Sequence, residues 1–160
     1  MKKTLILSII IAVMSGCSSI KSESQQEAHK SPILKTNLAA ESKTFTKDSI
    51  MLSFTVVNES DTTLRFCKWE TPFDPGIGKY MDIADAQGKE PSFIGAMARR
   101  VMPPPAESYI EVPPNDSLTT VFNLADSYAM DPGQYSVRYS GGAMGDFTAG
   151  NEIKITIGKE

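Results

Sequence analysis

Short stretches of alternating apolar and polar residues recur along most of the chain and predict β-strands. The clearest stretch, residues 49–57, places four large apolar side chains on one face: Ile50, Leu52, Phe54 and Val56. Similar stretches predict further strands at residues 33–40, 64–69, 79–84, 92–101, 108–112, 117–124 and 152–157. Turns rich in Asn, Asp, Gly and Pro separate them. Because helical periodicity is nearly absent, we predict an all-β domain built as a two-layer antiparallel sandwich.

A motif within residues 131–139 narrows the prediction of the fold. An Asp-Pro-Gly turn precedes Tyr135 at the entry to a predicted strand, and Val137 follows two residues later. Immunoglobulin-like sandwiches build a tyrosine corner from such a run, in which the hydroxyl bonds back to the backbone a few residues upstream. Val137 stands where antibody domains carry their second cysteine. We therefore predict an immunoglobulin-like β-sandwich over residues 32–160.

The first 16 residues have the pattern of an export signal. Two lysines precede an apolar run over residues 5–14, which is too short to span a bilayer, since that takes about 20 apolar residues. The Met-Ser-Gly-Cys sequence that follows resembles a bacterial lipobox, in which small residues precede a cysteine that receives lipid. We predict a signal peptide at residues 1–16 and lipidation at Cys17. A plain secretory signal with a chance cysteine is the alternative.

Residues 17–31 are predicted to form a flexible tether between the lipid and the domain. They contain one large apolar side chain, Ile20, and cannot bury enough surface to offset the entropy of ordering. Acyl chains such as palmitate anchor stably, because each buried CH₂ contributes about 0.8 kcal/mol. Ser18, in place of aspartate, generally favours outer-membrane sorting in Gram-negative lipoproteins. We expect a bacterial cell-envelope protein, lipid-anchored to the outer membrane and facing the periplasm.

The charge of the chain becomes more acidic once the leader is removed. The whole sequence has 16 basic and 19 acidic side chains, and residues 1–16 hold two of the lysines and no acid. The mature chain therefore has 14 basic and 19 acidic side chains, a formal charge of −5. This excess argues against a nucleic-acid partner, which requires a basic face. It does not argue against a protein partner.

Cysteine and histidine usage gives no support for catalysis or metal binding. If Cys17 is acylated, Cys67 has no intramolecular partner, and we expect it to be a small buried residue on a strand rather than a redox or metal site. The one histidine, His29, lies on the predicted tether, so a Ser/His/Asp triad has no support. We predict a protein that is not an enzyme, with no catalytic residue, metal or cofactor.

Ordered motifs over residues 33–140 resemble one known family. They include Phe-Cys-Lys-Trp-Glu-Thr-Pro at 66–72, Gly-Ala-Met-Ala-Arg-Arg at 95–100 and Gly-Gln-Tyr-Ser-Val at 133–137. Together they are similar to the N-terminal, non-catalytic β-domain of deuterolysin and peptidyl-Lys metalloendopeptidases. Those enzymes bind zinc through a His-Glu-x-x-His helix, and this chain has one histidine. The resemblance implies the β-domain standing alone as a bacterial lipoprotein, without the peptidase domain.

Residues suited to recognition are concentrated between Phe66 and Tyr109. Trp and Arg supply much contact energy per residue, and proline-rich runs form stiff loops. We predict a partner-binding surface formed by Trp69, Pro72, Phe73, Arg99, Arg100, Met102 and Pro103. The alternatives are a core position for Trp69, a buried Phe73, and arginines on opposite faces of a strand that pair with acidic side chains.

Two functions follow from these predictions. The first is a lipid-anchored, non-catalytic binding module that engages or regulates an exported peptidase or another envelope protein. The second is a structural envelope lipoprotein with no specific ligand. The concentration of Trp, Pro and Arg exceeds what a spacer needs, so the first is favoured. The sequence does not name the partner, the oligomeric state or the regulatory role.

Overall fold

The structure is a computed structural model that describes residues 33–141, 147–148 and 150–159. Ser31–Glu160 form one compact unit by their own contacts, and the fold described below is the fold of this unit. The predicted signal peptide at residues 1–16, the predicted tether at residues 17–31 and the lipidation site Cys17 lie outside the described residues.

The described residues form two larger sheets and two short strand pairs. The first sheet has the order β1-β3-β8, with β1 (Lys35–Ala40), β3 (Met51–Asn58) and β8 (Asp116–Asn123). The second has the order β2-β11-β10-β5, with β2 (Thr44–Phe45), β11 (Glu152–Ile157), β10 (Gly133–Tyr139) and β5 (Met81–Asp85). The short pairs are β4 (Leu64–Cys67) with β7 (Tyr109–Val112) and β6 (Ser92–Phe93) with β9 (Tyr128–Ala129). Two 3-10 turns are η1 (Ala106–Ser108) and η2 (Leu124–Asp126).

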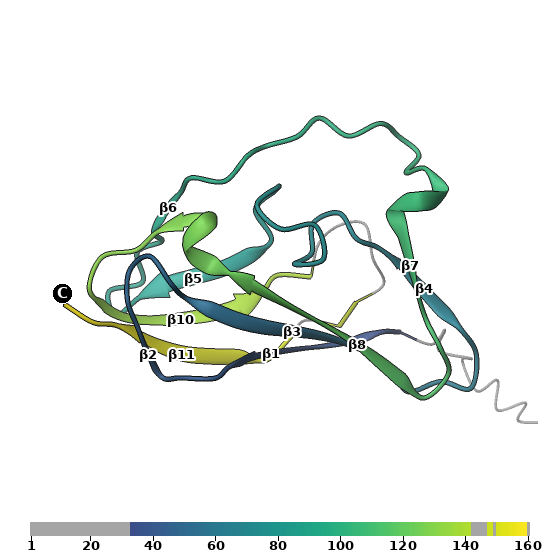
Figure 1. The fold of residues 1–160 in the computed structure, drawn as a ribbon, viewed down its shortest axis with the longest axis horizontal. Helices are drawn as coiled ribbons and strands as arrows, with labels where there is room; N and C mark the ends of the chain where they lie inside the picture. The colour runs from purple at the N-terminus through teal and green to yellow at the C-terminus, as the bar shows by residue number, and fades with distance from the viewer. Residues whose placement is uncertain (1–32, 142–146, 149, 160) are drawn as a thin grey trace, which may run out of the picture. The chain divides into compact units, whose positions relative to one another are not determined.

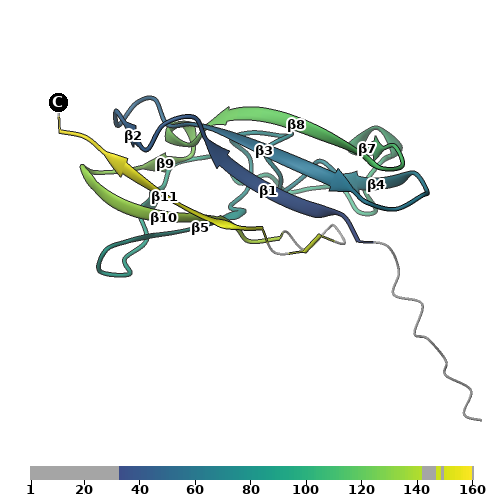
Figure 2. The ribbon, with the colours of Figure 1, turned by 90° about the horizontal axis from the view of Figure 1, so that it is seen from below.

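The two larger sheets face each other as the layers of a sandwich (Figures 1 and 2). Strands β1, β3 and β8 lie in one layer, and β5, β10 and β11 lie in the other, as Figure 2 shows. The pairings within these sheets are antiparallel, except for the parallel pairing of the short β2 with β11. The predicted all-β antiparallel sandwich is confirmed.

The core lies between the layers and follows the alternation seen in the sequence. The four apolar residues predicted to share one face of the third strand are at most 1% exposed: Ile50, Leu52, Phe54 and Val56. The facing layer contributes buried side chains from β10 and β11: Val137, Tyr139, Ile155 and Ile157. Full burial of one such aliphatic side chain contributes about 1.5–3 kcal/mol. The contact between the two layers is therefore a main source of stability.

Asn58 fixes the end of β3 to two separate connections. Its side chain is fully buried, and its amide nitrogen donates to the carbonyl oxygens of Thr62, Val112 and Pro113 at 2.8, 2.9 and 3.0 Å. One buried amide thus joins the turn after β3 to the connection between β7 and β8.

The strand predicted over residues 92–101 is wrong beyond Phe93. The strand β6 contains two residues, and after Ala96 the chain has no neighbouring strand among the described residues. A side chain at Gly95 would come within 2.7 Å of the Phe93 ring, and prolines at 103–105 cannot donate to a strand ladder. We call residues 94–105 the connecting segment; it runs along the upper side of Figure 1 from β6 toward β7.

The tyrosine corner is present as predicted. The hydroxyl of Tyr135 on β10 donates to the carbonyl oxygen of Asp131 at 3.0 Å, four residues upstream. Burial raises the pKa of Tyr135, so the hydroxyl keeps its proton and remains a donor. This bond fixes the entry of the chain into the central strand of the second sheet.

Replacing Tyr135 with Phe is expected to lower the free energy of unfolding by about 1–2 kcal/mol, because the carbonyl of Asp131 loses its donor. The denaturation midpoint should fall while the strand content, measured by circular dichroism, stays unchanged. Tyr109→Phe is the matched control, since no hydrogen bond of the Tyr109 hydroxyl occurs among the described residues. Equal midpoints for the wild-type protein and Tyr135→Phe would contradict the role of the corner.

Candidate functional site

The residues predicted to bind a partner come from two segments that lie side by side. One is the loop after β4, residues 68–80, and the other is the connecting segment. Their backbones meet where the amide of Gly78 donates to Ala96 at 2.8 Å and the amide of Ala96 donates to Gly76 at 2.9 Å. The two proline-containing regions therefore share one side of the domain.

Arg100 clamps the connecting segment onto this loop. Its Nη2 lies 2.5 Å from Oδ2 of Asp74, and its Cζ lies 4.8 Å from the centroid of the Trp69 ring. The Arg100 and Asp74 side chains are 26% and 23% exposed. A charge-assisted bond and a cation–π contact that are both shielded from water are stronger than the same contacts at an open surface. We call these three residues the arginine clamp.

Trp69 and Pro72 are buried, so their predicted role in direct partner binding is corrected. Trp69 is 8% exposed, the core position that the sequence left open as its alternative. Pro72 follows Thr71, whose hydroxyl donates to the carbonyl of Lys68 at 2.6 Å and accepts from the amide of Phe73 at 3.2 Å. These bonds hold the loop in a fixed turn. Trp69 acts on the site through its contact with Arg100.

Phe73 also belongs to the interior rather than to an exposed loop tip. Its ring lies 5.3 Å from the ring of Phe66 and 6.3 Å from the ring of Phe54, in edge-on arrangements. It is half-buried and packs on the core. Such aromatic pairs are worth about 0.5–1.5 kcal/mol beyond the burial of their area. This packing supports the alternative of a structural role for Phe73, and a binding role stays a prediction.

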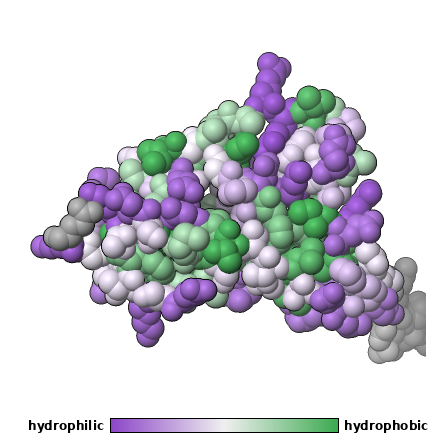
Figure 3. All heavy atoms as spheres, in the orientation of Figure 1, coloured by the Kyte–Doolittle hydropathy of each residue, from purple (hydrophilic) through white to green (hydrophobic). Residues whose placement is uncertain are grey.

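The remaining predicted residues, Arg99, Met102 and Pro103, are exposed on the connecting segment, unlike Arg100, which the clamp holds. The segment also exposes Ile94, Met97 and Val101, which the sequence reasoning missed because it treated residues 92–101 as a strand that buries alternate positions. The exposed fractions are 58% for Ile94, 75% for Met97, 76% for Val101 and 66% for Met102. Figure 3 shows hydrophobic patches along this edge, separated by hydrophilic side chains.

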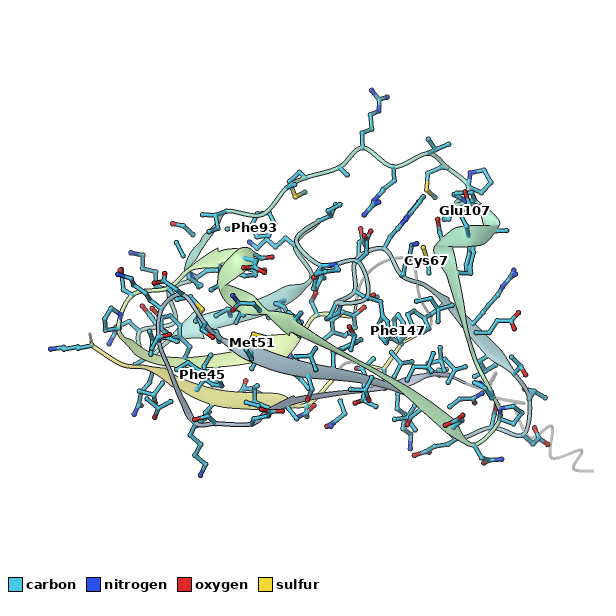
Figure 4. All side chains as sticks on the ribbon, in the orientation of Figure 1. Phe45, Met51, Cys67, Phe93, Glu107 and Phe147 are labelled. Carbon is cyan, nitrogen blue, oxygen red and sulfur yellow. The ribbon has the colours of Figure 1, made fainter. Side chains whose placement is uncertain are left out.

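The exposed face of the connecting segment carries one uncompensated positive charge. Among the described residues, Arg99 has no hydrogen bond or ion pair, and residues 91–106 contain no acid. The nearest acid before the segment, Glu90, pairs with Lys79 at 2.7 Å. Figure 4 labels Phe93 and Glu107 near the two ends of the segment. The result is an apolar surface with a single free guanidinium.

The buried tyrosines are structural hydrogen-bond donors. Burial raises the pKa of Tyr80, and it raises the pKa of Tyr128 to about 12. The hydroxyl of Tyr128 donates to the carbonyl of Met81 at 3.2 Å. Both hydroxyls therefore stay protonated near neutral pH.

Cys67 is a free thiol that is 1% exposed, which confirms the prediction of a small buried residue on a strand.

No metal centre is present in the part of the chain that the structure describes, where no group of three or more His, Cys, Asp or Glu side chains could hold an ion. An open groove of about 430 Å³ crosses the outer face of β10 and β11. Its charged lining residues are two of each sign: Lys43, Lys154, Asp85 and Glu152. None of the residues predicted to bind a partner lines this groove.

No helix in residues 33–141, 147–148 and 150–159 is long and apolar enough to cross a membrane.

Comparison with known proteins gives the class. The immunoglobulin-like domain family matches residues 18–154, most of the chain. The chain therefore belongs to the immunoglobulin-like domain family, in agreement with the sandwich and the tyrosine corner. No curated protein matches the chain significantly. The family match does not extend to deuterolysin or peptidyl-Lys metalloendopeptidases, so that resemblance stays a prediction.

Replacing Phe73 with Ala is expected to destabilise the domain by about 2–4 kcal/mol, because it removes a ring that contacts two core aromatics. The melting temperature measures the effect. Met102→Ala is the control, since its side chain is 66% exposed and its loss should change stability by less than about 0.5 kcal/mol. A similar small change in both variants would show that Phe73 is not part of the core.

Proposed function

We propose that this protein is a lipid-anchored, non-catalytic binding module of the bacterial cell envelope that recognises an exported protein through the connecting segment. One observation carries the proposal. Of the six large apolar residues that are exposed in the described chain, four lie on this segment: Ile94, Met97, Val101 and Met102. The other two, Met51 and Val121, lie on the strands β3 and β8.

The grouping of these side chains favours a binding surface over a spacer. Single exposed apolar residues are common and need no explanation, but four of them on one twelve-residue segment exceed such scattered exposure. Methionine suits such a surface because its unbranched side chain adapts to the shape of a partner. A spacer gains nothing from this arrangement. An apolar side chain left in solvent does not contribute the stabilisation of about 25 cal/mol per Å² that its burial would supply.

The segment is also held in place before any partner arrives. The arginine clamp fixes its middle, and the bonds between Ala96 and two loop glycines fix its start. A preorganised segment loses less conformational entropy when it binds, so more of the contact energy appears as affinity. This supports recognition by a stable surface rather than by a segment that folds on binding.

The non-catalytic part of the proposal has separate support. Membership of the immunoglobulin-like domain family suggests a binding or structural module. The sequence has one histidine, whereas the zinc peptidases that its motifs resemble need a pair one helical turn apart. An exported peptidase or another envelope protein is the proposed partner.

The double variant Met97→Gln/Met102→Gln should lose its partner without losing stability, because both side chains are mostly exposed. We expect at least about a tenfold decrease in the proteins captured from an envelope extract by the detergent-solubilised full chain, about 1.4 kcal/mol of affinity. Val121→Gln is the matched control, as its side chain is 58% exposed on β8, and it should capture as the wild type does.

Two results would contradict this expectation. Equal capture by the wild type and the double variant would show that the connecting segment is not the binding surface. Capture of nothing above background by the wild type would instead favour the structural envelope lipoprotein that the sequence left open.

Cys17→Ser should release the protein from membranes without changing the fold, because the lipid is proposed to be its anchor. After fractionation, the wild type is expected in the membrane pellet and the variant in the supernatant, with identical circular dichroism spectra. The serine variant still pelleting with membranes after a high-salt wash would show that a lipid on Cys17 is not the anchor.

A further inference from the structure

We propose that the connecting segment is a substrate-like loop that places Arg99 in the primary specificity pocket of an endopeptidase, one whose pocket carries a carboxylate. This inference rests on the proposed function, because it names the partner of the same surface. It is carried by the backbone of the segment, by the direction of Arg99 and by the residues on either side of it.

The backbone of residues 97–104 is open to a partner. Among the described residues, no backbone hydrogen bond links any of them to another part of the chain. Residues 97–101 form no helix, turn or bend, whereas the chain bends at Met102 and Pro103, which a cis peptide bond joins. Recognition by strand addition uses extended segments whose N–H and C=O groups are free. The connecting segment offers such a stretch.

The same stretch is anchored at both ends and in its middle. Ala96 bonds to two glycines of the neighbouring loop, and the carbonyl oxygen of Ser108 accepts from the amide of Lys68 at 2.8 Å. Between them the arginine clamp holds Arg100. These contacts restrain the exposed loop, so a peptidase would lose less entropy in ordering it than in ordering a mobile loop.

Arg99 points away from the protein for a geometric reason. Neighbouring residues of an extended chain project to opposite sides. Because Arg100 faces Trp69 and Asp74, Arg99 faces solvent, where it has no partner among the described residues. A free guanidinium on a fixed backbone can form a bidentate bond with a carboxylate, the geometry in which arginine exceeds lysine.

The residues two positions before and after Arg99 also suit binding to an endopeptidase. Side chains at a spacing of two share one side of an extended chain, which places Met97 and Val101 beside Arg99. They are 75% and 76% exposed. A peptidase that accepts the arginine would meet one apolar side chain on each flank, where hydrophobic subsites can cover them. The surface therefore offers a cation between two apolar contacts, in extended geometry.

Binding of the full chain in detergent to trypsin tests the proposal, with the active-site serine of trypsin replaced by alanine so that no cleavage occurs. Trypsin carries an aspartate in its primary pocket. Wild-type protein should bind, and Arg99→Ala should weaken the Kd at least about 100-fold. Arg99→Lys should stay within about tenfold of the wild type, because lysine keeps the charge. Benzamidine, which carries a similar cation, should displace the wild-type protein.

Arg65→Ala is the matched control variant. Arg65 is another exposed arginine, stacked 4.7 Å from the ring centroid of Tyr109 on the β4–β7 pair. Its replacement removes the same charge away from the segment, and the Kd should change by less than about twofold, as expected for a residue outside an interface. Melting temperatures of the Arg99 and Arg65 variants show that each is folded.

Three results would overturn the inference: no binding by the wild type, equal binding by Arg99→Ala, or binding that benzamidine does not displace. Binding of the wild type to anionic lipid vesicles through Arg99, without binding to trypsin, would assign the segment to a membrane surface instead. The capture experiment tests the proposed function independently of this inference. If capture depends on Met97 and Met102 while trypsin is not bound, the protein is still supported as a binding module, but an endopeptidase is not its partner.

Discussion

The contact between Tyr139 and Phe54 at the centre of the sandwich supports both the fold and the candidate site. The rings lie 4.7 Å apart and join the two layers. The hydroxyl of Tyr139 donates to the carbonyl of Glu70 at 3.2 Å, and Phe73 packs edge-on against Phe54 and Phe66. This hydrogen bond and these aromatic contacts hold the loop after β4 against the core. Its conformation depends on the same packing that holds the sheets together.

The connecting segment depends on this loop in turn. Trp69 and Asp74 hold Arg100 because the loop that carries them is fixed. Apolar side chains on an unrestrained segment would fold back onto the protein, since burial gains about 25 cal/mol per Å². Here the clamp below and the prolines at 103–105 limit the backbone, and the apolar side chains stay in solvent. Core packing therefore keeps the connecting segment exposed, although this segment lies elsewhere in the sequence.

The sequence predicted the features that depend on neighbouring residues. Alternation located the buried face of β3, and the corner at Tyr135 spans four residues, so both can be recognised locally. The errors concern contacts between distant residues. Alternation over residues 92–101 is the same whether or not another strand lies beside it, and here none does beyond Phe93. Phe73 reached the interior because Phe54 and Phe66 provide a place for its ring, which no local pattern contains.

One sequence argument held although the element that motivated it did not form. The sequence left open, as an alternative to a shared binding surface, that Arg99 and Arg100 face opposite ways because adjacent residues of a strand do so. The strand is absent, yet Arg100 is clamped and Arg99 is exposed. Opposite projection requires an extended backbone and no paired neighbour. The clamp therefore fixes which arginine is offered to a partner: a shift of one residue would bury Arg99 and expose Arg100, together with a different set of flanking side chains.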